Sequence, residues 1–547
     1  MKTVLFFLAL SLPWMTNPCF GGGNLHIKNN HYDVVVYGGT SAGIVAAVQA
    51  SRMGKHVVLI VPDGHLGGLT TGGLGQTDIG NKQVIGGIAR EFYERIAAKY
   101  DKPEAWVWQK KTEYKSYGQS ETVKGERTMW TFEPKVAAEV YGDMLRENKI
   151  PVVLNERLDL KHPCVMKKKT KIQAVVMESG HIFYGKMFID ASYEGDLMAK
   201  SGVSYTVGRE AESKYHETLN GVRTKQAIHH QFPDGIDPYI TQGDPSGGLL
   251  PGIFLTAGEE GAGDKKVQAY CFRMCLTDVP ENMIPPEKPE HYNEKEYELL
   301  FRYIAHGAKG PFFTFSPMPN RKTDSNNNGP FSTDFIGRNY DYPEGDYRTR
   351  EIIFREHENY QKGLLWTLAH HPRIPDSIRK VYKKWGLPKD EFPENGHWPP
   401  QLYIRESRRM VGDMVMTQHH CTGDSVVSRP VAMAAYTMDS HHVQRYVNAE
   451  GWVKNEGDVQ VGGFPPYPIG YGAIIPKVKE CTNLLVPVCL SASHIAYGSI
   501  RMEPVFMILG QSAATAACIA IDTKRPVQKV DYTLLRKKLL SDKQILK

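Results

Sequence analysis

The chain has 547 residues, 41% hydrophobic and 23% charged, which is enough apolar surface to offset the entropy of folding and to exclude extensive disorder. The chain has 66 Lys and Arg residues and 60 Asp and Glu residues, which gives a net charge of only +6. Composition therefore gives no support to a nucleic-acid partner. The mean hydropathy is −0.39, and no uninterrupted apolar stretch reaches about 18 residues, so no integral membrane span is expected.

The first 21 residues have the pattern of a secretory signal peptide. Lys2 precedes a short apolar run, residues 4–12. This run is too short for a bilayer, which takes about 20 residues, but fits the hydrophobic region of a signal sequence. We therefore expect a mature chain beginning near Gly22 and an exported, periplasmic protein. A lipid anchor on Cys19 is the weaker alternative, because the residues before it make a poor lipoprotein signal.

Residues 31–61 carry the most informative pattern of the chain. A β-branched run at 32–37 predicts a buried parallel strand, and a glycine-containing turn follows at 38–43. Residues 44–52 then predict a helix that Gly54 ends, and residues 56–61 predict a second strand. Such a βαβ unit of about 30 residues is typical of dinucleotide-binding folds.

The turn has the residue types that a pyrophosphate site needs. Glycine at position 38 permits a tight turn, and glycine at position 43 permits close packing of helix on strand. The helix start offers N–H groups and the positive end of its dipole to phosphate. Thr40 replaces the usual middle glycine, so the fingerprint is imperfect. We predict that the cofactor-binding turn consists of Gly38, Gly39, Thr40, Ser41, Ala42 and Gly43.

The acid that would hold an adenosine ribose is less clear. An Asp or Glu is expected at the end of the second strand, and Asp63 comes two residues late. Either Asp63 reaches back to the ribose or backbone groups hold it, and the sequence leaves both options open.

A loop rich in glycine and threonine, LGGLTTGGLG, follows at 66–75. Together with VVVYGGTSAG at 34–43, it resembles the FAD-dependent oxidoreductases of the glutathione-reductase-like superfamily. In that superfamily this loop runs along the pyrophosphate toward the flavin. The resemblance implies FAD as the cofactor and adds these binding residues: Gly67, Gly68, Leu69, Thr70 and Thr71.

Later segments fit the same plan. Residues 152–154 predict a third short strand, and residues 171–176 and 181–188 predict a β-hairpin. In these flavoproteins such a hairpin leads into a turn that returns the chain to the cofactor. Asp190 and Ala191 occupy that turn here, so the resemblance implies that both bind the cofactor. A helix is expected after Glu194, with acidic residues in its first turn.

The last quarter of the chain closes the fold. Residues 483–488 predict an apolar strand, and residues 505–521 predict a helix of small residues that could pack near a flat cofactor. Within it, Gly510 and Gln511 are predicted cofactor contacts. The motifs DASYEGDLMA, SYTVGRE, RESRRMVGD and SASHIAYGSIRMEP together resemble one family, the FAD-dependent oxidoreductases of the FAD_oxidored type. Some of its members carry the name xanthan lyase.

The resemblance covers nearly the whole mature chain and implies a fold. We expect an α/β protein with a Rossmann-like FAD-binding domain that is split in sequence, residues 31–203 and 439–547. An α+β substrate or cap region, residues 204–438, is inserted between the two parts. Within it, the polar residues 319–329 read as a loop. That loop is either an exposed connector or a substrate-facing segment.

A flavin oxidises a C–H bond while a base removes a proton from the adjacent O–H or N–H. His494 is the best base candidate, because its ordinary pKa suits proton transfer at neutral pH; its alternative role is structural. Arg501, with Glu503 as partner, is the candidate for stabilising negative charge on the flavin. Arg405, in a dense charge cluster with Arg408, is the candidate for gripping a ligand.

No metal site is predicted. The eight cysteines form no CxxC pair or zinc-type spacing. Two adjacent histidine pairs, His419-His420 and His441-His442, do not share a helix face and are poor ligand sets.

Three functions remain open. The first is an exported FAD-dependent oxidoreductase that transfers hydride from a small, carbohydrate-like alcohol to flavin N5 and then to an unknown electron acceptor. The second is a fumarate-reductase-like enzyme acting on a carboxylate-bearing C–C bond. The third is a non-catalytic flavin-fold binding protein.

Overall fold

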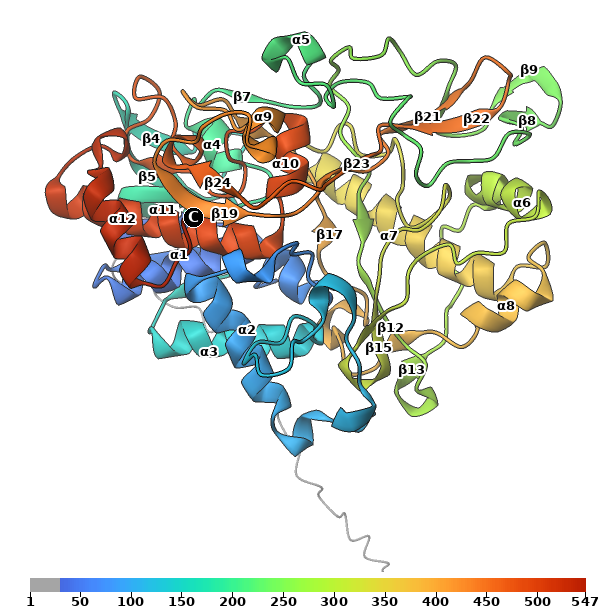
Figure 1. The fold of residues 1–547 in the computed structure, drawn as a ribbon, viewed down its shortest axis with the longest axis horizontal. Helices are drawn as coiled ribbons and strands as arrows, with labels where there is room; N and C mark the ends of the chain where they lie inside the picture. The colour runs from blue at the N-terminus through green and yellow to red at the C-terminus, as the bar shows by residue number, and fades with distance from the viewer. Residues whose placement is uncertain (1–29) are drawn as a thin grey trace, which may run out of the picture. The chain divides into compact units, whose positions relative to one another are not determined.

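The core of the fold is a seven-stranded sheet at the centre of the cofactor-binding part (Figure 1). The computed structural model describes residues 30–547, so the predicted signal peptide lies outside the described residues. The strand order is β3-β2-β1-β6-β5-β4, with β25 also beside β6, and β1, β2, β3, β6 and β25 run parallel. Their bounds are β1 His31–Tyr37, β2 Val57–Ile60, β3 Val152–Val153, β4 Val165–Lys168, β5 Lys171–Val176, β6 Ile182–Asp190 and β25 Leu484–Leu485.

The predicted βαβ unit is confirmed. The residues Val34 to Tyr37 of β1 are fully or almost fully buried, as expected for a strand covered on both faces. Helix α1 (Ser41–Arg52) links β1 to β2 and packs against α11 (Glu503–Thr523), the small-residue helix predicted near the carboxyl end. Helices α2 (Gly87–Tyr100) and α3 (Pro134–Glu147) complete this part of the protein.

The inserted region has more regular structure than its sequence suggests. Its longest element is α7 (Tyr347–His370), a 24-residue helix that crosses this half of the molecule (Figure 1). The same region contains a three-stranded antiparallel sheet of β12 (Met274–Thr277), β15 (Lys322–Ser325) and β14 (Ser316–Met318). The prediction of a loop over residues 319–329 is therefore wrong in part, because residues 322–325 form the buried strand β15.

The remaining helices and strands are short. The helices are α4 Asp196–Lys200, α5 Glu212–Tyr215, α6 Glu298–Ala305, α8 Asp376–Tyr382, α9 Gln418–Thr422, α10 His494–Ile500 and α12 Tyr532–Ser541. The strands are β7 Tyr205–Thr206, β8 Tyr239–Thr241, β9 Asp244–Leu249, β10 Ile253–Phe254, β11 Cys271–Phe272, β13 Met283–Ile284, β16 Leu387–Pro388, β17 Leu402–Tyr403, β18 Arg409–Met410, β19 Pro430–Ala434, β20 Met438–Ser440, β21 Gln444–Val447, β22 Val453–Glu456, β23 Val459–Val461 and β24 Tyr467–Gly470.

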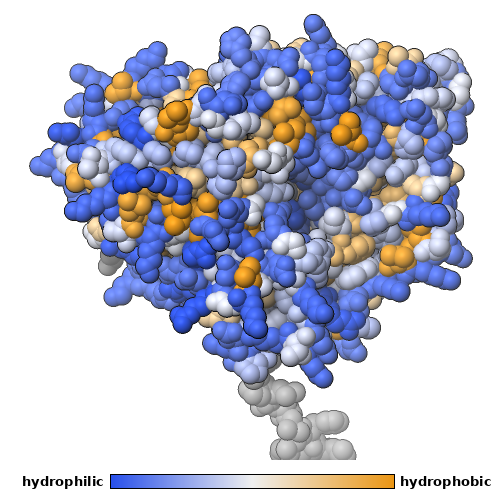
Figure 2. Space-filling view, in the orientation of Figure 1, coloured by the Kyte–Doolittle hydropathy of each residue, from blue (hydrophilic) through white to orange (hydrophobic). Residues whose placement is uncertain are grey.

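One described helix, α11, is long and apolar enough to cross a membrane by length and composition. Its most apolar window is 94% buried inside the protein, and buried core helices pass the same test. Polar residues cover most of the face seen in Figure 2, which is hollowed near its middle. The seven described cysteines are all buried and unpaired.

Candidate cofactor and active site

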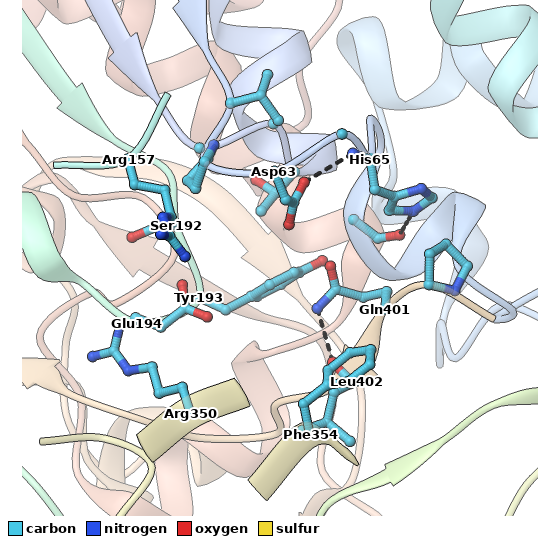
Figure 3. Close-up of a pocket in the computed structure, with 18 of the residues that line it drawn as sticks. Asp63, His65, Arg157, Ser192, Tyr193, Glu194, Arg350, Phe354, Gln401 and Leu402 are labelled. Atoms are coloured by element: carbon cyan, nitrogen blue, oxygen red, sulfur yellow. Dashed lines mark hydrogen bonds between the residues drawn. The ribbon is translucent and has the colours of Figure 1, made fainter. Parts of the chain in front are cut away.

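A cavity of about 670 Å³ opens where the parallel strands β1, β2 and β6 end (Figure 3). Ligands of open α/β sheets bind at this position, outside the carboxyl ends of the strands. The volume falls within the range of roughly 300–1,000 Å³ that is usual for small-molecule sites. The lining residues used below are Gly38, Gly39, Thr40, Asp63, His65, Gly68, Asn155, Arg157, Tyr193, Glu194, Tyr347, Arg350, Glu351, Phe354, Asn395, Gln401 and Leu402.

Three residues of the glycine turn, Gly38, Gly39 and Thr40, line the cavity, and neither Gly38 nor Gly43 tolerates a side chain. Gly38 has a φ of +109°, and a Cβ there would lie 2.6 Å from the backbone of Ala191. A Cβ on Gly43 would lie 1.9 Å from the carbonyl oxygen of Gly38. The chain therefore brings the backbone of β1, α1 and the turn after β6 into direct contact, as a close approach to pyrophosphate requires.

Thr40 stands in the middle of this turn and caps α1. Its Oγ1 accepts a hydrogen bond from the N–H of Gly43 (3.3 Å) and donates one to the carbonyl oxygen of Ala191 (2.7 Å). The threonine thus uses its hydroxyl to fix the turn. The positive end of the α1 dipole remains directed toward the cavity for an anionic ligand.

The loop at 66–75 lies beside the turn, and only part of it faces the cavity. Gly68 lines the cavity, and the N–H of Gly67 donates to the carbonyl oxygen of Gly39 (2.7 Å). The N–H of Leu69 donates to the hydroxyl of Tyr193 (3.0 Å). The hydroxyl of Thr70 donates to Glu503, and that of Thr71 donates to the carbonyl oxygen of Leu66.

Glu503, the first residue of α11, ties the parts of this site together. Its carboxylate accepts hydrogen bonds from the hydroxyls of Thr70 (2.9 Å), Tyr193 (2.7 Å) and Ser41. Burial raises the pKa of Glu503. The predicted pairing of Arg501 with Glu503 is wrong, because the guanidinium of Arg501 binds Asp439 instead (2.9 Å).

Five other predicted cofactor residues lie behind the cavity wall. The carboxylate of Asp190 accepts hydrogen bonds from the N–H groups of Ser192 and Met198, so it shapes the turn after β6. Ala191 contributes the carbonyl that receives Thr40. The remaining residues, Ala42, Gly510 and Gln511, are buried at the contacts of α11 with α1 and α2.

The part of the cavity beyond the end of β2 has the features of an adenosine site. Asp63 lines it, and its Oδ1 accepts the N–H of His65 (2.9 Å). Asn155 and Arg157 lie beside it, and the guanidinium of Arg157 stacks 4.3 Å from the ring centre of Tyr347 on α7. Asp63 is thus at the cavity despite its late position in sequence, which makes it the structural candidate for the ribose acid.

Glu194 is a cavity residue that sequence reasoning did not select. Burial raises its pKa to about 7, and the hydroxyl of Tyr342 donates to it (3.1 Å). It is half-buried and lines the same cavity as the glycine turn. A neutral carboxyl there is compatible with a nearby pyrophosphate, whereas an ionised one would repel it.

We expect FAD affinity to fall as pH rises through about 7, because ionisation of Glu194 adds a negative charge beside an anionic ligand. Between pH 6 and pH 8 the Kd should rise about tenfold, which corresponds to about 1.4 kcal/mol. Glu194→Gln should abolish this trend in fluorescence titrations of apoprotein with FAD. Glu351→Gln, a matched change at an exposed cavity residue, should keep it; an unchanged trend in Glu194→Gln contradicts the assignment.

The three predicted catalytic residues belong to one buried polar network that does not line the cavity. Arg405 and Arg501 flank the ring of Tyr403, with guanidinium carbons 4.5 Å and 5.5 Å from its centre. His494 lies close by and is 2% exposed. Its Nδ1 contacts Glu406 (2.6 Å) and its Nε2 contacts Ser440 (3.1 Å). Tyr403 follows Leu402, a cavity residue, so the network lies directly behind that wall.

His441 is the network member that sequence reasoning missed. Its Nδ1 lies 2.7 Å from Asp334, which also binds Arg405 (2.9 Å). Its Nε2 lies 3.6 Å from Asp439, the partner of Arg501. Burial disfavours a charged imidazole, yet these carboxylates raise the pKa of His441. Sequence showed only two adjacent histidines, because Asp334 lies 107 residues away along the chain.

One group of carboxylates in the described part of the chain is spaced closely enough to hold a metal: Glu133, Asp390 and Glu391. The ammonium of Lys322 lies among them, 2.7 Å from Glu133 and 2.6 Å from Glu391. A buried ammonium already supplies the positive charge there, so the group is a salt-bridge cluster.

The fold and the cavity define a dinucleotide-binding flavoprotein of the split Rossmann type. The model of the family described as FAD dependent oxidoreductase matches residues 33–539. The chain therefore belongs to this family, and its cofactor is FAD. The residues fit that cofactor, since the glycine cradle cannot accept a Cβ and the dipole of α1 faces the cavity.

The structural comparison matches solved enzymes over part of the chain. A thioredoxin reductase from Streptococcus pyogenes is 18% identical over 34% of this chain and 40% of its own, with a TM-score of 0.17. An L-proline dehydrogenase from P. horikoshii is 13% identical over 33% of this chain and 59% of its own, with a TM-score of 0.24. A mutant flavin monooxygenase from Stenotrophomonas maltophilia is 16% identical over 33% of this chain and 42% of its own, with a TM-score of 0.19. The chain thus spans less than two thirds of each. No curated protein matches the sequence.

Proposed function

We propose that the protein is an exported, periplasmic FAD-dependent oxidoreductase that oxidises a small, carbohydrate-like alcohol and passes the electrons to a separate acceptor. The observation that carries this proposal is the outer wall of the cavity. There the cap region contributes Glu351, Asn395 and Gln401 opposite the glycine turn. Carboxylate and amide groups are suitable partners for the hydroxyls of a polyol.

When bound, FAD supplies the acceptor for a hydride from the substrate carbon. The chain's own residues have three tasks. The turn and loop hold the cofactor, α7 covers the cavity and limits water, and a base takes the proton of the substrate hydroxyl. Both ring nitrogens of His494 already have partners. His441 is the second candidate for that base, because its Nε2 lies 3.6 Å from Asp439, beyond hydrogen-bonding distance, while Asp334 contacts its Nδ1 and would stabilise the protonated ring.

The fumarate-reductase-like alternative needs an arginine free to bind a substrate carboxylate. Each arginine around Tyr403 already pairs with an aspartate: Arg405 with Asp334, Arg501 with Asp439 and Arg273 with Asp324. A paired guanidinium has less capacity for a second carboxylate. This pairing favours the alcohol over the organic acid.

The test is anaerobic bleaching of the yellow holoprotein by a panel of sugars, polyols and organic acids. We expect bleaching by at least one polyol or sugar and none by succinate-like acids; the reverse pattern supports the alternative, and a colourless protein supports a binding role.

His441→Asn should slow bleaching about 10²–10⁴-fold at unchanged FAD content, the usual effect of losing a general base. His494→Asn is the matched variant. If it slows bleaching more than His441→Asn does, His494 is the base.

A further inference from the structure

Arg445, on strand β21, is a buried arginine without a carboxylate partner among the described residues. Arg445 is only 5% exposed, and its Nε has no hydrogen-bond partner in the structure. One terminal nitrogen donates to the carbonyl oxygen of Pro330 at a long 3.4 Å. The guanidinium carbon lies 5.2 Å from the ring centre of Phe331.

This arrangement leaves a positive charge without a counter-charge. Arginine stays protonated in proteins, so the site cannot become neutral by losing a proton. An unpaired buried charge is strongly unfavourable. The nearest acids are already engaged: Glu296 binds Arg338 through both oxygens (2.8 Å each), and Asp334 binds Arg405 and His441.

A cavity of about 10 Å³ lies beside Arg445, and it admits one water molecule or one monatomic ion. Two further cationic residues line it, Arg338 and Lys295, against one acid, Glu296. Apolar side chains form much of the rest of the wall, namely Leu250, Leu299, Phe331, Phe335 and Ile336. Such a cavity is too small for a carboxylate or a phosphate and carries excess positive charge.

We propose that Arg445 and this cavity bind a single halide ion, with chloride as the natural occupant. The ion would complete the hydrogen bonding of the guanidinium and neutralise it. It would also join β21 to α7, which contributes Tyr360, and to the segment around Phe331 and Phe335. That segment includes Asp334, so the ion stabilises the carboxylate that holds Arg405 and His441. This inference does not depend on the proposed substrate.

Bromide identifies the occupant directly. Crystals of the full protein grown in sodium bromide should show an anomalous peak about 3.2–3.5 Å from the guanidinium nitrogens of Arg445, a hydrogen-bonding distance lengthened for a large anion. A peak elsewhere only, or a water at this position without anomalous signal, overturns the proposal.

Thermal unfolding of the holoprotein gives a second test. At equal ionic strength, chloride and bromide should raise the Tm by about 1–3 °C over methanesulfonate, with saturation, because a ligand that binds only the folded state stabilises it. Arg445→Met should lose this halide-specific shift, whereas Arg429→Met, an equal charge change at an exposed arginine, should keep it. Equal Tm values in halide and methanesulfonate for the wild-type protein overturn the proposal even if Arg445→Met does not fold.

Discussion

Gly43→Ala should yield a colourless protein that does not bind FAD. The added Cβ would lie 1.9 Å from the carbonyl oxygen of Gly38 and 3.3 Å from the Cβ of Ala191. The obstacle is backbone at the tightest point of the turn, so relief requires α1 to move away from β1 and β6. We expect a loss of about 2–3 kcal/mol of stability from overpacking, and a loss of more than 100-fold in FAD affinity because the phosphate cradle opens. Apoprotein titration and urea unfolding measure both.

Gly54→Ala is the matched control at the other end of α1. Gly54 has a φ of +74°, but no atom lies within 4 Å of a Cβ built there. The substitution should therefore cost only the strain of a left-handed conformation, about 1 kcal/mol, and the protein should remain yellow. If Gly43→Ala binds FAD as well as Gly54→Ala does, the turn is not the phosphate site.

The elements that sequence predicts well are those whose pattern is local. A β-branched run followed by a glycine turn and an alanine-rich helix allows one compact arrangement. The bounds of β1, α1 and β2 therefore agree with the predicted bounds to within two residues, except that α1 begins three residues earlier than predicted. The same holds for α11. The burial of these elements also follows from their composition, because they have no polar face.

Hydrogen bonds and ion pairs between residues far apart in the sequence could not be predicted in this way. The partner of Glu503 was expected two residues away in Arg501, yet its hydrogen bonds come from Ser41, Thr70 and Tyr193. The cap region shows the same limit, because the polar strand β15 is buried through ion pairs such as Lys322 with Glu133. Nothing in the local sequence of a charged residue reveals whether a distant partner permits its burial.

Glu503→Ala should be among the most damaging single changes in the protein. Loss of the carboxylate leaves three buried hydroxyls without their acceptor, on α1, on the loop at 66–75 and on the turn after β6. We expect a loss of about 3–5 kcal/mol in stability, the range for removing a buried hydrogen-bonding or charged partner. FAD should dissociate early in unfolding, because these three segments line or support the cavity. Urea unfolding followed by flavin fluorescence and circular dichroism measures both effects.

Glu503→Gln separates hydrogen bonding from charge. Glutamine keeps the shape and an acceptor oxygen, so at neutral pH its cost should stay within about 1–1.5 kcal/mol. Burial raises the pKa of Glu503 in the folded protein, so the folded state holds its proton over a pH range in which the unfolded state has lost it. The contribution of Glu503 is therefore greatest below its ordinary pKa and declines as pH rises through the folded value. Relative to Glu503→Gln, the wild-type protein should lose stability as pH rises above the ordinary pKa of a glutamate, about 4.3. A constant difference, or a Gln variant as unstable as Glu503→Ala, would show that the ionised carboxylate itself holds the site together.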